Sequence, residues 1–317
     1  MRAAPDDGRA NETALIRHAY AGQVTVVAQP LRIMPTLRQR YSELEHWSPP
    51  LAKATVASLL LFVIAAVGFA VDQRVITGAP AWLKPMKFGA SGVVYLFTIA
   101  WMVRELPQSR MLRVASNLIA WILVLEVVLI HVQATRGTTS HFNINTPLDT
   151  AIFSTMGLGI ATVWVMSMVV LWLHVRTRAT DRNMAIALRL GMALNILGAG
   201  VGWTMTQPRP AQLAAMQRGA RPRVAGSHTV GAPDGGAGLP VTLWSREHGD
   251  LRVPHFLGMH ALQLLPLLVL GLRRVRRSHD DGTERTSVLF VAALSAAIFA
   301  AALMQALAGH PLIPSTG

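Results

Sequence analysis

The chain of 317 residues contains no cysteine. This absence excludes disulfide bonds, thiolate metal sites, iron–sulfur clusters and a cysteine nucleophile. Charged residues are scarce as well: they make up 14% of the chain, whereas a typical soluble domain has about 25%. Hydrophobic residues reach 52%. So large a shortage of charge indicates that much of the protein surface does not face water.

The few charges that are present are mostly positive, with 29 lysines and arginines against 16 aspartates and glutamates. Such a balance in a soluble protein favours nucleic-acid binding. No recognition motif accompanies it here, however, and the arginines gather beside apolar segments. We therefore expect lipid-facing arginines that set the topology in a bilayer, and no nucleic-acid partner.

Seven apolar segments of about 20 residues each predict transmembrane helices, because this length crosses the hydrocarbon core. The expected fold is all-α: a polytopic bundle that occupies residues 51–310. The expected spans are residues 51–71, 86–104, 112–133, 150–174, 184–205, 254–272 and 287–308. Residues 1–50 lack the apolar core of a signal peptide and are expected to form a partly disordered cytoplasmic segment.

The connections between these spans alternate in character. Three are short and rich in arginine, near residues 104–113, 176–182 and 273–285. The positive-inside rule places them in the cytoplasm of a bacterial inner membrane, with the N-terminus inside and the C-terminal tail 311–317 outside. Arg74, Lys84 and Lys87 on the opposite side weigh against this orientation, although Lys84 and Lys87 beside Trp82 are typical of an interfacial anchor.

The other three connections are expected on the outer face. They span residues 72–85, 134–149 and 206–253. The third is the longest and is rich in glycine, proline and aspartate, which favours turns over a packed domain. A loop of this length is usually either disordered or functional.

The 11 histidines are unevenly placed, and most are expected on or near the outer face. Imidazole is the commonest metal ligand and also binds haem iron. His131, His255 and His260 are the predicted ligands of either a haem or a divalent transition metal. Two observations weigh against this site: histidine is tolerated at membrane interfaces, and a five-residue spacing rotates about 140° around a helix. His255 and His260 cannot grip one ion from one straight helix.

Glu126 lies in the middle of the third apolar segment. A carboxylate at that depth costs several kcal/mol unless it is protonated or paired. One interpretation is a structural contact with a neighbouring helix, for which Arg189 is a candidate partner. The other is a proton acceptor that faces substrate. On the second interpretation, Glu126 and His141 are the candidate catalytic residues.

The outer segment 136–149 is short and polar. Arg136, Ser140, Asn143 and Asp149 are candidates to bind an anionic or hydroxylated small molecule, although Asp149 is equally suited to cap the helix that follows. Asp234 is assigned to the same substrate-binding group. Its glycine-rich surroundings lack the pattern of a phosphate-binding loop.

The strings AWLKPMKFGAS, RGTTSHFNINTP and PDGGAGLP resemble those of an uncharacterised bacterial multi-pass membrane family. The resemblance covers most of the chain beyond residue 50 and implies no activity. Three functions therefore stay open. The first is a metal- or haem-dependent membrane enzyme or redox protein with a histidine-rich outer pocket. The second is a small-solute or ion-coupled transporter that uses Glu126 and Arg189. The third is a non-catalytic assembly or sensory protein.

Overall fold

A computed structural model describes residues 36–275 and 281–314. The predictions for residues 1–35 and 315–317 lie outside the described residues. Residues 1–40 and 41–317 form two separate units. Of the first unit, only residues 36–40 are described, and helix α2 (Leu37–Trp47) begins there. The second unit contains the long apolar helices.

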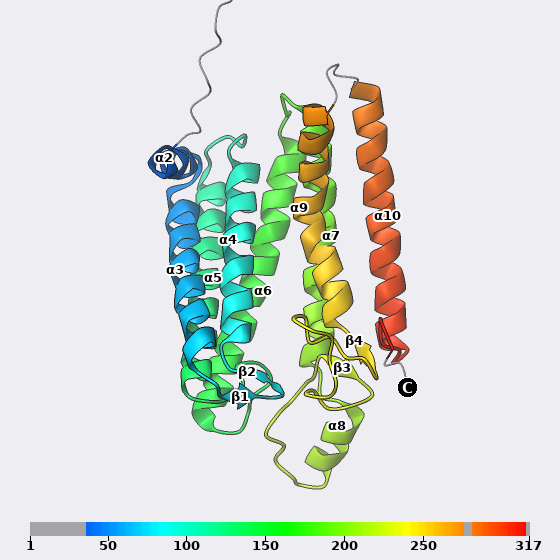
Figure 1. The fold of residues 1–317 in the computed structure, drawn as a ribbon. Coiled ribbons are helices and arrows are strands. Elements are labelled where there is room, and N and C mark those ends of the chain that lie inside the picture. The colour runs from blue at the N-terminus through cyan, green and yellow to red at the C-terminus, as the bar shows by residue number, and fades with distance from the viewer. Residues whose placement is uncertain (1–35, 276–280, 315–317) are drawn as a thin grey trace, which may run out of the picture. The chain divides into compact units, whose positions relative to one another are not determined.

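In the described part of the chain, seven helices are long and apolar enough to cross a membrane, which confirms the predicted fold class (Figure 1). They are α3 (Pro49–Val71), α4 (Leu83–Val103), α5 (Arg110–Thr135), α6 (Pro147–Arg176), α7 (Arg182–Thr206), α9 (Arg252–Val275) and α10 (Asp281–Leu307). The protein is therefore an all-α, multi-pass integral membrane protein.

Several helices begin two or three residues before the predicted apolar runs, because polar caps start them. Ser109, Thr146 and Asp181 each accept a hydrogen bond from the backbone N–H three residues further on. Such caps satisfy donors that the first turn of a helix leaves free. Hydropathy locates the apolar middle of a span, and capping chemistry sets its end.

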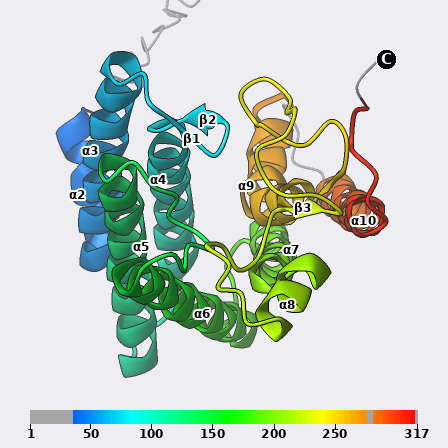
Figure 2. The ribbon, with the colours of Figure 1, turned by 90° about the horizontal axis from the view of Figure 1, so that it is seen from below.

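The helices of the second unit pack in two groups, which Figure 2 shows end-on. The first group is α3 to α6, and the second is α7, α9 and α10; α6 packs against α7. Glycines allow close backbone approach within each group. A Cβ on Gly198 of α7 would lie 2.7 Å from Gly258 Cα of α9, and one on Gly89 of α4 would lie 2.8 Å from Phe62 Cα of α3. Close contact through small residues is the usual packing mode of membrane helices.

Ion pairs organise the arginine-rich end. Arg273 of α9 bonds Asp181, which caps α7, and Glu284 of α10, with N···O distances of 2.5 and 2.6 Å. Arg189 of α7 donates to the carbonyls of His174 and Thr177, at the C-terminal end of α6. Arg189 therefore satisfies helix-end carbonyls and does not pair with Glu126.

The opposite end carries the loops and is called the loop-bearing end below. Strands β1 (Val75–Ile76) and β2 (Ala79–Pro80) form an antiparallel hairpin between α3 and α4. The longest loop contains helix α8 (Pro210–Gln217) and the antiparallel strands β3 (Thr229–Val230) and β4 (Gly249–Asp250). The sequence predicted only turns there, so α8 is an addition.

Candidate functional site

A cluster of ionisable side chains lies at the loop-bearing end. It consists of Lys84, Glu126, His141, His228 and Asp234, which we call the polar cluster. The residues come from α4, from α5 and from the two loops 136–146 and 207–251. They are therefore far apart in the sequence and are gathered only by the fold.

The Glu126 carboxyl faces His141. Glu126 is 3% exposed, and its Oε1 atom has no hydrogen-bond partner in the described part of the chain. The Oε1 atom lies 3.7 Å from His141 Nε2, too far for a hydrogen bond. The other ring nitrogen of His141 lies 3.0 Å from the Ser140 hydroxyl. The structure thus brings together Glu126 and His141, the two residues predicted to be catalytic.

A tight turn places His141 beneath α5. Asn143 donates from its side-chain amide to the Thr138 hydroxyl and to the Thr139 carbonyl, each at 3.0 Å. Phe142 adopts a φ of 63°, in the left-handed region that is uncommon for a residue with a side chain. Asn143, predicted to bind substrate, is therefore engaged within its own turn.

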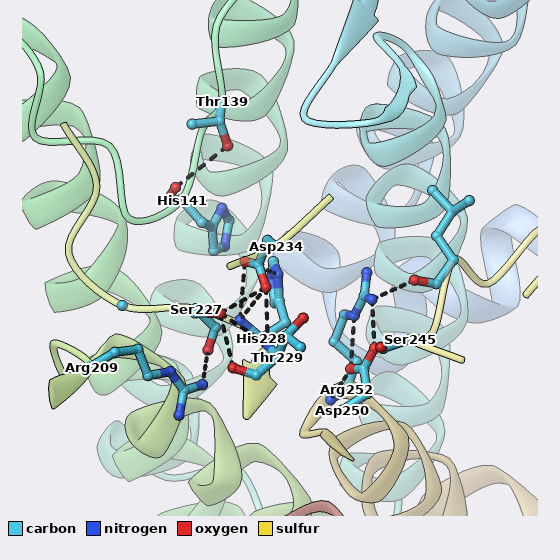
Figure 3. Close-up of polar contacts among 12 residues, drawn as sticks. Thr139, His141, Arg209, Ser227, His228, Thr229, Asp234, Ser245, Asp250 and Arg252 are labelled. Carbon is cyan, nitrogen blue, oxygen red and sulfur yellow. Dashed lines mark hydrogen bonds and ion pairs between the residues drawn. The ribbon is translucent and has the colours of Figure 1, made fainter. Parts of the chain in front are cut away.

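The Asp234 carboxylate gathers donors from a second turn (Figure 3). It accepts hydrogen bonds from the Ser227 hydroxyl at 2.8 Å and from the backbone N–H groups of His228 and Thr229 at 3.0 and 2.9 Å. Its Oδ2 atom also lies 2.9 Å from His228 Nδ1. Because a carboxylate only accepts, His228 carries its proton on Nδ1, and its Nε2 is left with a lone pair.

The surroundings set the protonation states of these loop residues. Burial alone would raise the pKa of Asp234, but hydrogen bonds from His228 and Ser227 hold it far below its usual value. Burial lowers the pKa of His228, although Asp234 opposes that effect. Burial, together with the Lys84 charge, lowers the pKa of His141 well below its usual value. At neutral pH the site therefore presents an ionised Asp234 and two neutral imidazoles.

Aromatic rings join the members of the polar cluster. The Lys84 ammonium lies 5.9 Å from the ring centroid of Phe88, and the His141 ring lies 5.6 Å from the same ring. Phe142 lies 6.1 Å from His141 and 4.9 Å from His228. The cluster is thus bordered by apolar rings, which reduce its contact with water and strengthen electrostatic interactions.

Two other residues predicted to bind substrate contact each other. Arg136 bonds the Asp149 carboxylate at 2.7 Å and also bonds Gln133, which itself donates to Asp149 at 3.0 Å. The Thr146 hydroxyl donates to the same carboxylate at 2.6 Å. These contacts tie the end of α5 to the start of α6. Their role in substrate binding stays a prediction.

The predicted metal ligand His131 is engaged by the backbone. Its Nδ1 lies 2.8 Å from the Val127 carbonyl oxygen, and its Nε2 lies 3.0 Å from the Leu61 carbonyl oxygen. A metal ion at either nitrogen would displace one of these contacts.

The other two predicted ligands lie on α9. His255 donates from Nδ1 to the Gly198 carbonyl at 2.7 Å, and its Nε2 has no hydrogen-bond partner among the residues that the structure describes. His260 packs on Phe256, with ring centroids 4.2 Å apart. Within residues 36–275 and 281–314, no group of three or more His, Asp or Glu side chains is arranged to hold a metal ion. The metal or haem site stays a prediction.

Sequence reasoning missed His228 and Lys84 as members of the cluster. From the sequence, Lys84 is typical of an interfacial anchor, and nothing singles out His228 among the histidines expected on the outer face. The sequence holds one signal: His228 and Asp234 bracket a short segment containing Gly231 and Pro233, which favours a turn. Nothing in the sequence brings Lys84 near Glu126, because that contact depends on helix packing.

Fold and site together define a multi-pass membrane protein with a loop-covered cluster of acid–base groups at one end of its helix bundle. No protein-family model, curated protein or solved structure matches the chain.

Proposed function

We propose that the protein is a membrane-embedded enzyme that transfers protons to and from a small-molecule substrate at the polar cluster. One observation carries this proposal: the buried Glu126 Oε1 atom lacks a hydrogen-bond partner among the described residues and lies 3.7 Å from His141. Buried polar atoms are nearly always bonded, so an unbonded carboxyl oxygen needs a reason. A reacting group that must stay free for substrate provides one.

At 3.7 Å the Glu126 carboxyl and the His141 ring are close enough to contact the same substrate group from one side, although no atom fits on the line between them. Catalytic hydrogen bonds are often long before substrate binds. His141 is neutral at physiological pH because its pKa is lowered, so it is able to accept a proton. In the proposed reaction Glu126 and His141 exchange protons with the substrate, and the low-dielectric surroundings make that exchange sensitive to position.

His228 is proposed as a second acid–base group. Asp234 fixes its tautomer and its orientation, as a buried aspartate does for the general base of many hydrolases. The Nε2 lone pair is then directed away from Asp234 and is available for a proton. Ser227 is not a nucleophile in this scheme, since its hydroxyl donates to Asp234.

A metal- or haem-dependent reaction is a second candidate. His228 and His255 each donate their Nδ1–H to an oxygen atom and leave Nε2 free. Metal-binding histidines have the same outer contact. His228 and His255 would supply two ligands to a metal ion. A third ligand would have to come from the substrate or from a side chain that moves.

We propose further that the loop-bearing end faces the outside of a bacterial inner membrane, with the N-terminus inside. The arginine-rich connections gather at the opposite end of the bundle, which supports this orientation. The resemblance of AWLKPMKFGAS, RGTTSHFNINTP and PDGGAGLP to segments of an uncharacterised bacterial membrane family supports membership of that family.

The proposed enzyme activity is tested by screening extracts for compounds that the protein consumes. Purified protein in nanodiscs is incubated with total lipid and metabolite extracts of a bacterium, and consumption is followed by untargeted mass spectrometry. Wild-type protein is expected to consume at least one compound, and Glu126→Gln should slow this by roughly 100-fold or more, as for loss of a general acid–base group. Glu247→Gln, an exposed loop glutamate, is the matched control and should keep the wild-type rate.

Equal rates for Glu126→Gln and wild-type protein would contradict the proposed role of the carboxyl. Elemental analysis of the same samples separates the two candidates. Stoichiometric zinc, iron, copper or manganese that is lost in His228→Gln would favour the metal-dependent reaction over the metal-free one.

A further inference from the structure

Lys84 is an interior cation without a bonded anion. It lies in the first turn of α4, its residue is only partly exposed, and within the described residues its ammonium forms neither a hydrogen bond nor an ion pair. Neighbouring cations differ. Lys87 donates to the Thr242 carbonyl at 3.2 Å, and Arg252 is held by Asp250 at 2.6 Å. Lys84 is therefore left to interact with the Phe88 ring and with whatever enters the cluster.

The ammonium group belongs to the same cluster as the proposed reacting groups. Lys84 and His141 lie against the same Phe88 ring, at 5.9 and 5.6 Å from its centroid. The Glu126 Oε1 atom, which has no hydrogen-bond partner among the described residues, is 3.7 Å from His141 Nε2. The charge of Lys84 is among the causes that lower the pKa of both His141 and His228, which places Lys84 within electrostatic range of both rings.

The charges of Glu126 and Asp234 act on Lys84, but among the described residues neither carboxyl group bonds its ammonium. The ionised Asp234 is already satisfied by Ser227, His228 and Thr229. A partly desolvated ammonium without a bonded anion is costly, and an anion bound there would reduce that cost. Lysine binds phosphate and carboxylate groups as a point charge.

We propose that the substrate of this site carries an anionic phosphate or carboxylate group that binds Lys84, while its reacting part contacts Glu126 and His141. The inference rests on the proposed enzyme function and names the class of its substrate. Two sources fit this chemistry: a soluble anion that enters through the loops, and the headgroup of an anionic lipid that enters from the bilayer.

The test measures binding, so it is independent of turnover. Protein in phosphatidylcholine nanodiscs is titrated with inorganic phosphate and, separately, with acetate, and the unfolding temperature is followed by tryptophan fluorescence. In a second arm, native mass spectrometry counts the phosphatidylglycerol molecules that the protein retains. Wild-type protein is expected to bind in at least one arm: phosphate or acetate identifies a soluble anion, and retained phosphatidylglycerol identifies a lipid headgroup.

Lys84→Met should weaken that binding by roughly tenfold or more, which corresponds to about 1.4 kcal/mol. Lys84→Arg keeps the charge and should restore it, which shows that the loss is not a folding defect. Lys53→Met, which removes an exposed lysine of α3, is the matched control and should bind like wild-type protein.

Equal binding by wild-type protein and Lys84→Met in both arms would overturn the proposal, and so would the absence of binding by wild-type protein in both. Glu126→Gln should retain the anion, because it leaves Lys84 in place. Anion binding without turnover would therefore refute the catalytic proposal alone, whereas turnover without any effect of Lys84→Met would refute the anion site alone.

Discussion

Gly198→Val is expected to prevent α7 and α9 from packing and to abolish the yield of monodisperse protein. A Cβ at Gly198 would lie 2.6 Å from the backbone N of Met259 and 2.7 Å from Gly258 Cα. These are backbone atoms, so no side-chain rotation relieves the clash. The same movement would break the hydrogen bonds from Asn195 to the Met259 carbonyl and from His255 to the Gly198 carbonyl. We expect a loss of about 3 kcal/mol or more.

The matched control is Gly157→Val on α6. A Cβ at Gly157 meets no atom within 4 Å, and the change in helix propensity is the same. Size-exclusion chromatography and thermal unfolding in one detergent compare the two variants. If Gly198→Val purified and unfolded like Gly157→Val, the close packing of α7 on α9 would be wrong.

Asp234→Ala is expected to release the turn that carries His228. The substitution removes the acceptor of the Ser227 hydroxyl, of the backbone N–H groups of His228 and Thr229, and of the His228 ring. A hydrogen bond to a charged group contributes about 1.5–3 kcal/mol, so amide exchange at His228 and Thr229 should accelerate by roughly 100-fold or more. The transmembrane helices should keep their protection, since none of these donors belongs to them.

Hydrogen exchange with mass spectrometry measures this effect. Glu247→Ala removes an exposed carboxylate from the same loop and serves as the control. Exchange in segment 227–234 that stays slow in Asp234→Ala would show that other contacts hold the turn. Faster exchange throughout the bundle would show that Asp234 supports the whole fold.

The helices could be predicted because each depends on a local property of the sequence. An apolar run of about 20 residues crosses a bilayer wherever it lies in the chain. The ends were less accurate because they depend on caps. For example, α6 begins at Pro147 after its Thr146 cap, three residues before the predicted start.

The candidate site could be predicted only in part, because its contacts are not local. Glu126 could be recognised from the sequence because a carboxyl group within an apolar span is costly in any membrane protein. Its proximity to His141 depends on the turn around Asn143, and the position of His228 depends on the donors gathered by Asp234. His131 illustrates the converse: its contact with the Leu61 carbonyl comes from helix packing and leaves no trace in the sequence.

The polar cluster is assembled from helices and from loops. The bundle positions Glu126 and Lys84 on neighbouring helices, and two loops bring His141 and His228 to them. Membrane proteins place ionisable groups at depth mainly where chemistry or transport requires them. Arg189, the charge that a transport pair would use, caps α6 instead. That contact argues against a transporter based on a Glu126–Arg189 pair.

The most direct measurement is nitrogen NMR of the histidine rings in protein labelled with ¹⁵N-histidine, with signals assigned through His141→Gln and His228→Gln. At pH 6.5, where a free imidazole is about half protonated, lowered pKa values predict neutral rings at both positions. His228 should be protonated on Nδ1 alone, and the His141 signals should move in Glu126→Gln. A cationic His228 would contradict the proposed proton-transfer site, and so would His141 ring ¹⁵N shifts that are the same in wild-type protein and Glu126→Gln.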